Sequence, residues 1–590
     1  MPTTTRSQSA QGEPQIAREL VLEHVQRILA SDLFRRSERL CRFLQFSIEA
    51  ALKGESERTK EYVVGVEVFD RGASFDSRID PVVRVEARRL RAKLKQWHET
   101  EGRDSAIVIE LPTGAYATLF RYRHARPQTI TSAEKTIAVL PFVNLNGDPD
   151  LDYFSDGLTE ELTHALTRVK GLHVVAWPSA LRLKGQEQDI AAIRDRLRVE
   201  NILRGSVRRF GDRLRMTAQL IDTADEHYLW SEAWDRSTSD LLMIEQEIAD
   251  AIVDKLRVPA DQQLSSAVAP LRRDAESHTL YLKGRFHLNK RSPEGLQAAV
   301  SFFEQASKAD GRSALVWAGL ADAHALSATY GMAEPATAMS AATSAADTAI
   351  ALDASLAEPY TCLAFVRGYE WKWQQSGELY RKSITMNPRY PTAHHWYATD
   401  YLVKLGFVEE AILEMDQAIA LDPLSSIKLE GRAYLSMIAG DLDDARQRYE
   451  ELLEHDRWFY MAWSSLGRLY TTTGEYGKAI EMYWMARSIA GDFPKILGAL
   501  GQTLGLAGQR EEARALLDSL QATSRTRYVG NASFALIHLG LGEEDAALDR
   551  LEQVVQTHEL SAPGLKVHPA WDTLRSHPRF QALLKQVGLV

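Results

Sequence analysis

Six cationic residues fall at helical spacing between residues 82 and 97, in the stretch VVRVEARRLRAKLKQW. They are Arg84, Arg88, Arg89, Arg91, Lys93 and Lys95. The first, second, fourth and sixth are separated by four, three and four residues, so an α-helix would align them along one face. Guanidinium and ammonium groups aligned in this way suit contact with the phosphates of a nucleic-acid backbone. The pattern therefore predicts a DNA-binding helix face.

An apolar stripe with the same period runs beside these cations. Its members are Val83, Ala87, Leu90, Leu94 and Trp97. The stripe predicts that one helix face is buried in a core. Asp80 is a suitable cap and Pro81 a suitable first helical residue. A charged face beside an apolar stripe is also typical of an ordinary surface helix, in which arginines would form internal ion pairs with Asp76, Asp80 or Glu86.

The neighbouring segments supply the elements that would position this helix. LVLEHVQRIL and ERLCRFLQFSIEAAL predict two amphipathic helices, and KEYVVGVEVF predicts a short third one. After the basic helix, AIVIELPTGAYATLF contains two β-rich runs around Pro112-Thr113-Gly114, which predicts a hairpin. Helices followed by a hairpin describe a winged helix, which we expect over residues 16–123.

The stretch KEYVVGVEVFDRGASFDSRIDPVVRVEARRLRAKL resembles the transcription-factor domain of OmpR/PhoB-type regulators, over about residues 58–120. In that family a short helix, a loop and a recognition helix precede the wing. The resemblance implies that the aligned cations face DNA, and that Thr113 and Tyr116 lie on or beside the wing. The chain differs from the family in one respect, because residues 1–15 predict a disordered tail where the family has an N-terminal sheet.

A period of 34 residues organises the second half of the chain. GFVEEAI, GDLDDAR, GEYGKAI, GQREEAR and GEEDAAL share a first glycine and an alanine five positions later. The glycines are Gly406, Gly440, Gly474, Gly508 and Gly542, and the alanines are Ala411, Ala445, Ala479, Ala513 and Ala547. Glycine suits the tight turn between two helices, and alanine suits the place where those helices pack most closely.

These units resemble the tetratricopeptide repeat, whose period and residue types they share. The unit from Trp463 to Ala486 shows the pattern almost whole, and the resemblance covers about residues 277–560. It implies an all-α solenoid over residues 277–590, with the last residues capping the stack. It also implies a groove that holds a protein or peptide partner.

Between these parts, residues 134–257 alternate strands with helices and predict a small α/β domain. IAVLPF, FSDGLTEEL and RGSVRR resemble the TolB-like amino-terminal domain. That domain accompanies tetratricopeptide arrays in many bacterial proteins. Some of these carry a winged helix, as in CadC-type regulators, and some carry a class III adenylate cyclase.

Two clusters of titratable residues could suggest further chemistry. They are Asp156, Glu160, Glu161 and His164 on one predicted helix, and the adjacent pair His394 and His395. Solvated charges at a helix start explain both clusters more simply. The sequence contains no Walker loop, GxGxxG after a strand, GxSxG elbow or HExxH, and no segment remains for a cyclase domain. We therefore expect no enzyme activity, no cofactor and no metal site.

Charge and composition agree with a nucleic-acid-binding head. The 590-residue chain has a net charge of −10, but residues 1–126 hold 22 Lys and Arg against 18 Asp and Glu. The head is thus at +4 and the body at −14, as expected for a basic DNA-binding head on an acidic body. The two cysteines, Cys41 and Cys362, and the lack of an apolar run of about 18 residues predict a cytoplasmic protein without a membrane span.

The sequence as a whole predicts a multidomain chain. The expected order is a tail (1–15), a winged helix (16–123), a linker (124–133), a TolB-like α/β domain (134–257), a linker (258–276) and a tetratricopeptide solenoid with its cap (277–590). The first hypothesis is a DNA-binding transcriptional regulator with a protein- or peptide-binding array. The alternatives are an interaction scaffold whose winged helix binds protein, and a regulatory subunit of a nucleotide-signalling enzyme. The oligomeric state stays open.

Overall fold

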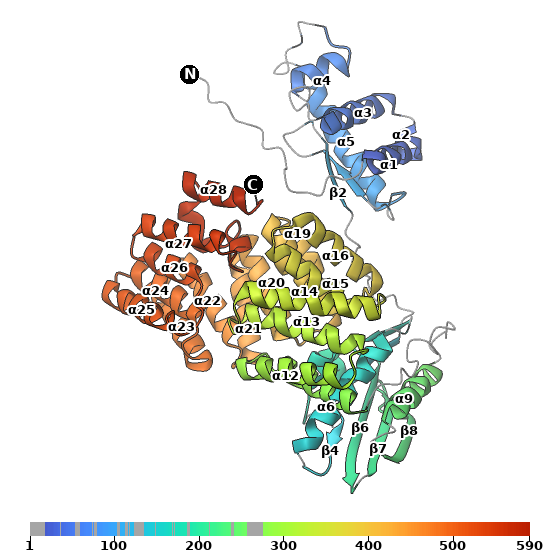
Figure 1. The fold of residues 1–590 in the computed structure, drawn as a ribbon. Coiled ribbons are helices and arrows are strands. Elements are labelled where there is room, and N and C mark those ends of the chain that lie inside the picture. The colour runs from blue at the N-terminus through green and yellow to red at the C-terminus, as the bar shows by residue number, and fades with distance from the viewer. Residues whose placement is uncertain are drawn as a thin grey trace. The chain divides into compact units, whose positions relative to one another are not determined.

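In a computed structural model the chain divides into two compact units, residues 1–126 and 127–590 (Figure 1). The described residues are 18–35, 37–53, 60–72, 75, 80–102, 105, 107–111, 116, 118–122, 135–147, 149–167, 169, 171–185, 189–211, 213–237, 241–256 and 275–589. The predicted tail over 1–15 and the predicted linker over 124–133 lie outside them, as do residues 258–274 of the second predicted linker.

The first unit consists of helices followed by a pair of antiparallel strands. The elements are α1 (Arg18–Ala30), α2 (Asp32–Arg35), α3 (Glu38–Lys53), α4 (Glu61–Glu67), α5 (Val82–Glu99), β1 (Ile107–Glu110) and β2 (Leu119–Tyr122). The predicted helices and the two antiparallel strands of the predicted hairpin are present, whereas residues 112–115 of its turn lie outside the described ones, and only the short α2 was not expected. The apolar stripe of α5 is buried along its whole length, with every member at most 2% exposed. The core of this unit therefore depends on the face of α5 that the sequence period predicted.

The second unit begins with a mixed sheet. Its elements are β3 (Lys135–Val139), β4 (Val143–Asn144), α6 (Pro149–Thr167), β5 (Leu172–Val174), α7 (Trp177–Leu181), α8 (Ile190–Leu197), β6 (Asn201–Phe210), β7 (Arg213–Asp222), β8 (Tyr228–Ser237) and α9 (Leu241–Lys255). The strand order is β5-β3-β6-β7-β8, and β4 also pairs with β6. The pairs among β3, β4, β5 and β6 are parallel, whereas β6, β7 and β8 form an antiparallel meander.

Alternation along β3 explains why this sheet is covered on both faces. Ile137 and Val139 belong to the core that includes α6 and α9, whereas Ala138 and Leu140 belong to the core that includes α8. Successive side chains of a strand point to opposite faces, so a continuous apolar run indicates a strand that is buried on both sides.

An array of paired helices forms the rest of the second unit (Figure 1). Its elements are α11 (Ala275–Asn289), α12 (Pro293–Ala309), α13 (Ala314–Thr329), α14 (Pro335–Leu352), α15 (Glu358–Tyr369), α16 (Trp373–Met386), α17 (Pro391–Trp396), the π-helical η3 (Tyr397–Leu402), α18 (Val403–Leu405), α19 (Val408–Leu421), α20 (Ser426–Ile438), α21 (Leu442–His455), α22 (Tyr460–Thr472), α23 (Tyr476–Ala490), α24 (Pro494–Leu506), α25 (Arg510–Thr523), α26 (Asn531–Gly540), α27 (Glu544–Gln556), the 3-10 turns η4 (Ala562–Gly564) and η5 (Pro569–Leu574), and α28 (Pro578–Gln586). None of the described helices is long and apolar enough to cross a membrane.

The 34-residue period corresponds to the structure of this array. All five period glycines have positive φ, between 76° and 97°, and each lies in the turn between two helices. All five period alanines are fully buried. Both residue types therefore occupy the positions that the repeat pattern predicted, because a left-handed turn favours glycine and a close helix contact favours a small side chain.

The end of the array also contacts its middle. The indole Nε1 of Trp373 donates to the carbonyl oxygen of Val587 at 2.8 Å, and Lys566 Nζ donates to the carbonyl oxygen of Leu405 at 2.7 Å. These partners are 214 and 161 residues apart in the sequence. The predicted terminal cap is thus bonded to earlier helices as well as to the repeat before it.

The sheet and the array share one apolar core. Leu158, Leu162 and Leu166 of α6 belong to the same cluster as Leu282 of α11. A side chain at Gly157 would place its Cβ 2.8 Å from that of Leu282. Glycine in the FSDGLTEEL motif therefore permits close packing between α6 and α11, which joins the α/β part to the array.

Candidate functional site

The basic helix α5 is held at its start by Asp80. The carboxylate of Asp80 accepts the backbone N–H of Val82 at 3.0 Å and forms an ion pair with Arg71 at 3.1 Å. Pro81 precedes the first helical residue. Asp80 therefore has the capping role that the sequence predicted, one position further from the helix than expected.

Arg88 and Lys95 are the predicted cations that most clearly meet the demands of phosphate binding. Both side chains are exposed on α5, and neither has an ion-pair partner among the described residues. They lie seven residues apart, two helical turns, on the side of α5 that turns away from the buried stripe. Two cationic groups about 10 Å apart along the helix axis are thus available to a ligand.

Arg84 and Arg91, which share this face, have partners within the unit. Arg84 Nε lies 3.1 Å from Glu61 Oε1 of α4, and its side chain is still half exposed. Arg91 Nε donates to the carbonyl oxygen of Leu111 at 2.8 Å, just after β1. Arg91 therefore also connects the helix to the hairpin, so its replacement would disturb the fold together with any ligand contact.

Arg89 and Lys93 lie on the other flank of α5. Arg89 forms an ion pair with Glu86 at 2.9 Å. Lys93 Nζ donates to the carbonyl oxygen of Leu33 and to the hydroxyl of Ser37, both at 2.5 Å. The six cations are therefore divided between two flanks, and Lys93 fixes α5 against α2 and the residue Ser37 that follows it.

Only one of the two predicted wing residues, Tyr116, lies in the described part of the chain. Thr113 lies outside the described residues. Tyr116 is partly buried against the core of the first unit, with its ring 6.4 Å from that of Phe43. Burial and the nearby carboxylate of Glu61 raise the pKa of the Tyr116 hydroxyl.

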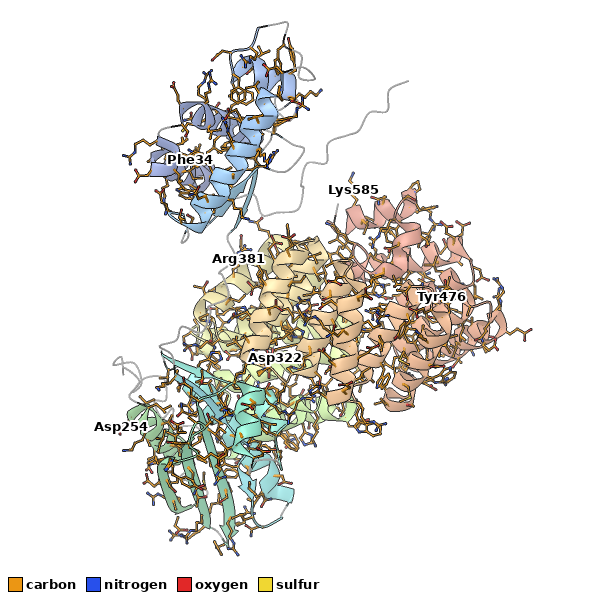
Figure 2. The ribbon with its side chains drawn as sticks, turned by 180° about the vertical axis from the view of Figure 1, so that it is seen from behind. Phe34, Asp254, Asp322, Arg381, Tyr476 and Lys585 are labelled. Carbon is orange, nitrogen blue, oxygen red and sulfur yellow. The ribbon has the colours of Figure 1, made fainter. Side chains whose placement is uncertain are left out.

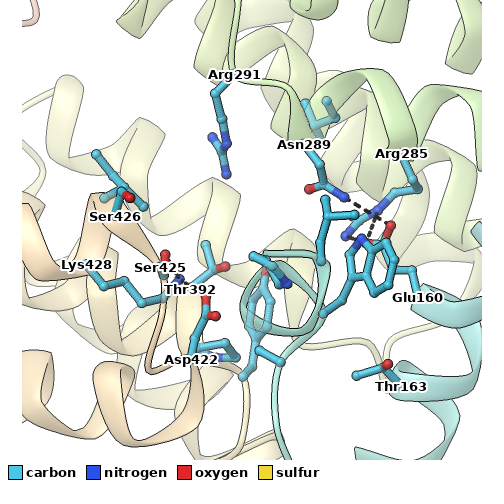
Figure 3. Close-up of a pocket in the computed structure, with 18 of the residues that line it drawn as sticks. Glu160, Thr163, Arg285, Asn289, Arg291, Thr392, Asp422, Ser425, Ser426 and Lys428 are labelled. Carbon is cyan, nitrogen blue, oxygen red and sulfur yellow. Dashed lines mark hydrogen bonds and ion pairs between the residues drawn. The ribbon is translucent and has the colours of Figure 1, made fainter. Parts of the chain in front are cut away.

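A second candidate site is a cavity of about 470 Å³ in the second unit (Figure 3). Its walls come from α6 and α7 of the α/β part and from the array, namely α13, the start of α15 and the turns that follow α11, α16, α19 and α21. Aromatic side chains contribute much of the apolar lining. They include Trp177, Tyr390, Trp396 and Phe459. This volume is that of a typical small-molecule pocket.

Ion pairs connect the two sides of the cavity. Arg285 of α11 binds Glu160 of α6, which also accepts Asn289 Nδ2 at 3.1 Å (Figure 3). Arg182, after α7, lies 2.6 Å from Asp456 of the array. Partly buried pairs of this kind hold the α/β part in one position on the array.

Two members of the titratable cluster of α6, Asp156 and Glu160, are not solvated, so the prediction was wrong for them, and the side chain of His164 lies outside the described residues. Asp156 is buried and its carboxylate accepts Lys184 Nζ at 2.8 Å. Burial raises the pKa of Asp156, and Lys184 opposes that rise. Glu160 is occupied by Arg285. The sequence could not reveal these roles, because the partners lie 28 and 125 residues away.

The histidine pair is also buried, contrary to the prediction. His394 Nδ1 lies 2.6 Å from Glu414 Oε2, and its Nε2 lies 2.9 Å from the carbonyl oxygen of Pro388. Burial lowers the pKa of His395 well below its ordinary value. No group of three His, Cys, Asp or Glu side chains within the described ranges is arranged to hold a metal ion.

The cavity was not predicted from the sequence, and Arg291 and Asp322 are the two of its lining residues that bear most on what it could bind. Arg291 has φ of 51°, a left-handed backbone that is uncommon for a residue with a side chain. Asp322 is only 7% exposed, and Figure 2 shows it within the array. Burial raises the pKa of Asp322 to about 7. A buried aspartate on an otherwise small and apolar helix, ALVWAGLADAHALSAT, was the available signal.

Residues 133–253 match the family described as "HilA/YgeH-like transcriptional regulator, second domain". This region is the one that resembles the TolB-like domain, and that finer assignment stays a prediction.

Over 344 residues the chain is 20% identical to "Transcriptional regulator HilA" of Salmonella typhimurium, covering 56% of this chain and 60% of the relative. Over 134 residues it is 42% identical to "Putative adenylate cyclase 3" of Rhizobium meliloti, covering 23% of each. The chain thus spans less than two thirds of either relative.

Solved structures with helical repeats are similar to parts of the chain. They include pilF of Pseudomonas aeruginosa, at 18% identity and a TM-score of 0.30, which covers 40% of this chain and 100% of that one. A tetratricopeptide repeat protein of Parabacteroides merdae has 14% identity and a TM-score of 0.33, with 45% and 100% covered.

The cyclase match contradicts the prediction that the chain has no enzyme activity. A segment of 134 residues shares 42% of its positions with a protein described as an adenylate cyclase. The prediction relied on the absence of a few short motifs, and such motifs represent only some reaction classes. We therefore withdraw it.

Proposed function

We propose that the chain is a transcriptional regulator that binds DNA through the exposed flank of α5 and a protein or peptide partner through its helical array. In this proposal residues 16–123 form a winged helix, and residues 134–257 couple it to the array over 277–590. The match of residues 133–253 to a transcriptional-regulator family supports the regulatory role. The similarity to a Salmonella typhimurium regulator over 344 residues supports it further.

The observation that carries DNA binding is the division of α5 into two faces. One face carries the apolar stripe and is buried in the core. The other face carries Arg88 and Lys95, whose side chains are exposed and can contact a ligand. A helix that precedes a hairpin and presents cations two turns apart has the form of a recognition helix. Contacts from these two side chains would go to phosphates, and they would give affinity more than sequence preference.

The test is an electrophoretic mobility shift of a mixed-sequence duplex by the full chain, measured between about 50 and 200 mM salt. The Arg88→Ala/Lys95→Ala double variant should bind several-fold more weakly. Its plot of log affinity against log salt should lose about 2 from its slope, because two phosphate contacts are removed.

The matched control is the Arg27→Ala/Arg525→Ala double variant, which removes the same charge from exposed positions on α1 and in the turn after α25. It should retain the slope of the parent. Equal losses in both double variants would mean that net charge alone acts, and no shift of the duplex by the parent at low salt would refute DNA binding.

A nucleotide-signalling activity is the second candidate, favoured by the 42% identity to a protein described as an adenylate cyclase. The purified full chain would then convert ATP to cyclic AMP in the presence of a divalent metal. Product measured by mass spectrometry above a blank without protein would support this candidate, and its absence would remove it.

A further inference from the structure

The cavity between the α/β part and the array is lined by more charged side chains than those that form ion pairs with one another. Three pairs neutralise one another: Arg182 with Asp456, Arg285 with Glu160, and Lys428 with Asp422. Lys428 and Asp422 lie 2.7 Å apart and are both buried, and Asp422 also accepts the hydroxyl of Ser179. These six side chains therefore hold the walls together.

Among the other charged side chains of the lining, Arg389 donates to the carbonyl oxygen of Val169, Lys290 lies over the ring of Phe286, and Glu358 has an interaction partner of its own. Two groups of opposite charge remain in the lining after these and the three pairs are set aside. They are the guanidinium of Arg291 and the carboxyl of Asp322. Neither side chain has a hydrogen bond or ion pair with a described residue, although each lies within electrostatic range of the other. Asp322 is buried, and a buried polar group without a partner is costly, which makes it receptive to a ligand, whereas the guanidinium of Arg291 is only partly buried.

The backbone at Arg291 supports a role for its side chain. The left-handed conformation is unfavourable for a residue that carries a Cβ, and glycine would adopt it freely. Figure 3 shows the Arg291 side chain reaching from the turn after α11 into the open space of the cavity. Arginine at this position, whose backbone suits glycine, places a guanidinium in the lining of the pocket.

We propose that this cavity binds a small amino-carboxylate, of the class of a free amino acid, with its carboxylate on Arg291 and its ammonium on Asp322. A guanidinium binds a carboxylate through paired hydrogen bonds, and a carboxylate binds an ammonium group. The rest of the ligand would contact the aromatic lining formed by Tyr390 and Trp396. The volume of about 470 Å³ fits a molecule of this size and excludes a folded partner.

Such a ligand would bind to both parts of the second unit at once. Arg291 and Asp322 belong to the array, whereas Trp177 and Thr163 on the opposite wall belong to the α/β part. Because the ligand binds only the assembled cavity, it stabilises the contact between the two parts by mass action. This inference does not depend on DNA binding by α5.

The test uses the full chain with each of the twenty standard L-amino acids at about 10 mM, followed by differential scanning fluorimetry. At least one amino acid should raise Tm by about 2 °C or more. Isothermal titration calorimetry of that amino acid should give a Kd at least tenfold higher for Arg291→Gly and for Asp322→Asn than for the parent. Glycine at 291 suits the observed φ, so this variant removes the side chain without backbone strain.

The matched control is Arg312→Ala, which removes a largely exposed arginine from the α12–α13 turn outside the cavity. It should bind the amino acid as the parent does. Sodium butyrate and n-butylamine, which carry one charge each, should give no comparable shift. The proposal is overturned if no amino acid raises Tm, if both cavity variants bind like the parent, or if either singly charged probe acts as well.

Discussion

At the scale of single residues, Asp322 shows how burial determines a protonation state. Its carboxyl lies among groups from three elements, namely Arg285 of α11, Arg291 of the following turn and Glu358 of α15. Burial raises the pKa of Asp322 to about 7, the arginines oppose the rise, and Glu358 adds to it. Between about pH 4 and pH 7 the folded chain therefore keeps a proton that the unfolded chain has lost, and stability falls as pH rises through this window.

Asp322→Asn should remove this dependence, because the amide cannot ionise. We compare the free energy of unfolding of the variant with that of the parent. This difference should favour the variant by about 2 kcal/mol more at pH 8 than at pH 5. Urea denaturation at the two pH values measures the difference, and any effect of the amide on packing cancels between them. An equal change at both values would contradict the assigned protonation state.

At the scale of elements, α23 shows how tightly paired helices pack around the period alanine. Ala479 is fully buried in the core shared with α22 and α24. Ala479→Leu should overpack this contact and cost about 1–3 kcal/mol of unfolding free energy. Thermal denaturation would measure the loss. Ala354→Leu, at an exposed turn position, is the comparison and should change stability little.

Local periodicity allowed much of this architecture to be predicted. The buried stripe of α5 and the turn glycines from Gly406 to Gly542 depend on spacing within one or two helices, which the sequence displays directly. The short helix α7 was not predicted, because five residues are too few to show a period. It nevertheless matters, since Ser179 of α7 donates to Asp422 of the array.

The candidate sites were less predictable than the elements. The cationic flank of α5 could be proposed from spacing, yet only the structure shows that Lys93 and Arg91 bind backbone carbonyls. The cavity could not be proposed at all. Its pair Arg285 and Glu160 joins positions 125 residues apart, and no local pattern encodes such a contact.

At the scale of the whole molecule, the close approach of α6 to α11 makes the sheet and the array one unit. Gly157→Ala should therefore destabilise the second unit by about 1–3 kcal/mol, despite the better helix propensity of alanine. Gly477→Ala in α23 is the matched substitution, since a Cβ there meets nothing within 4 Å, and it should stabilise by up to about 1 kcal/mol. Chemical denaturation monitored by circular dichroism compares them. If the two substitutions changed the free energy of unfolding equally, the α6–α11 contact could accommodate the added methyl group.

The bonds from Trp373 to Val587 and from Lys566 to Leu405 change how this array can come apart. In an open stack each unit touches only its neighbours, so the last helices fray first and exchange their amide hydrogens fastest. Here fraying at the C-terminal end must also break contacts with α16 and α18. Hydrogen exchange followed by mass spectrometry should therefore find α28 protected nearly as well as α16, and Trp373→Phe should selectively speed exchange in α28.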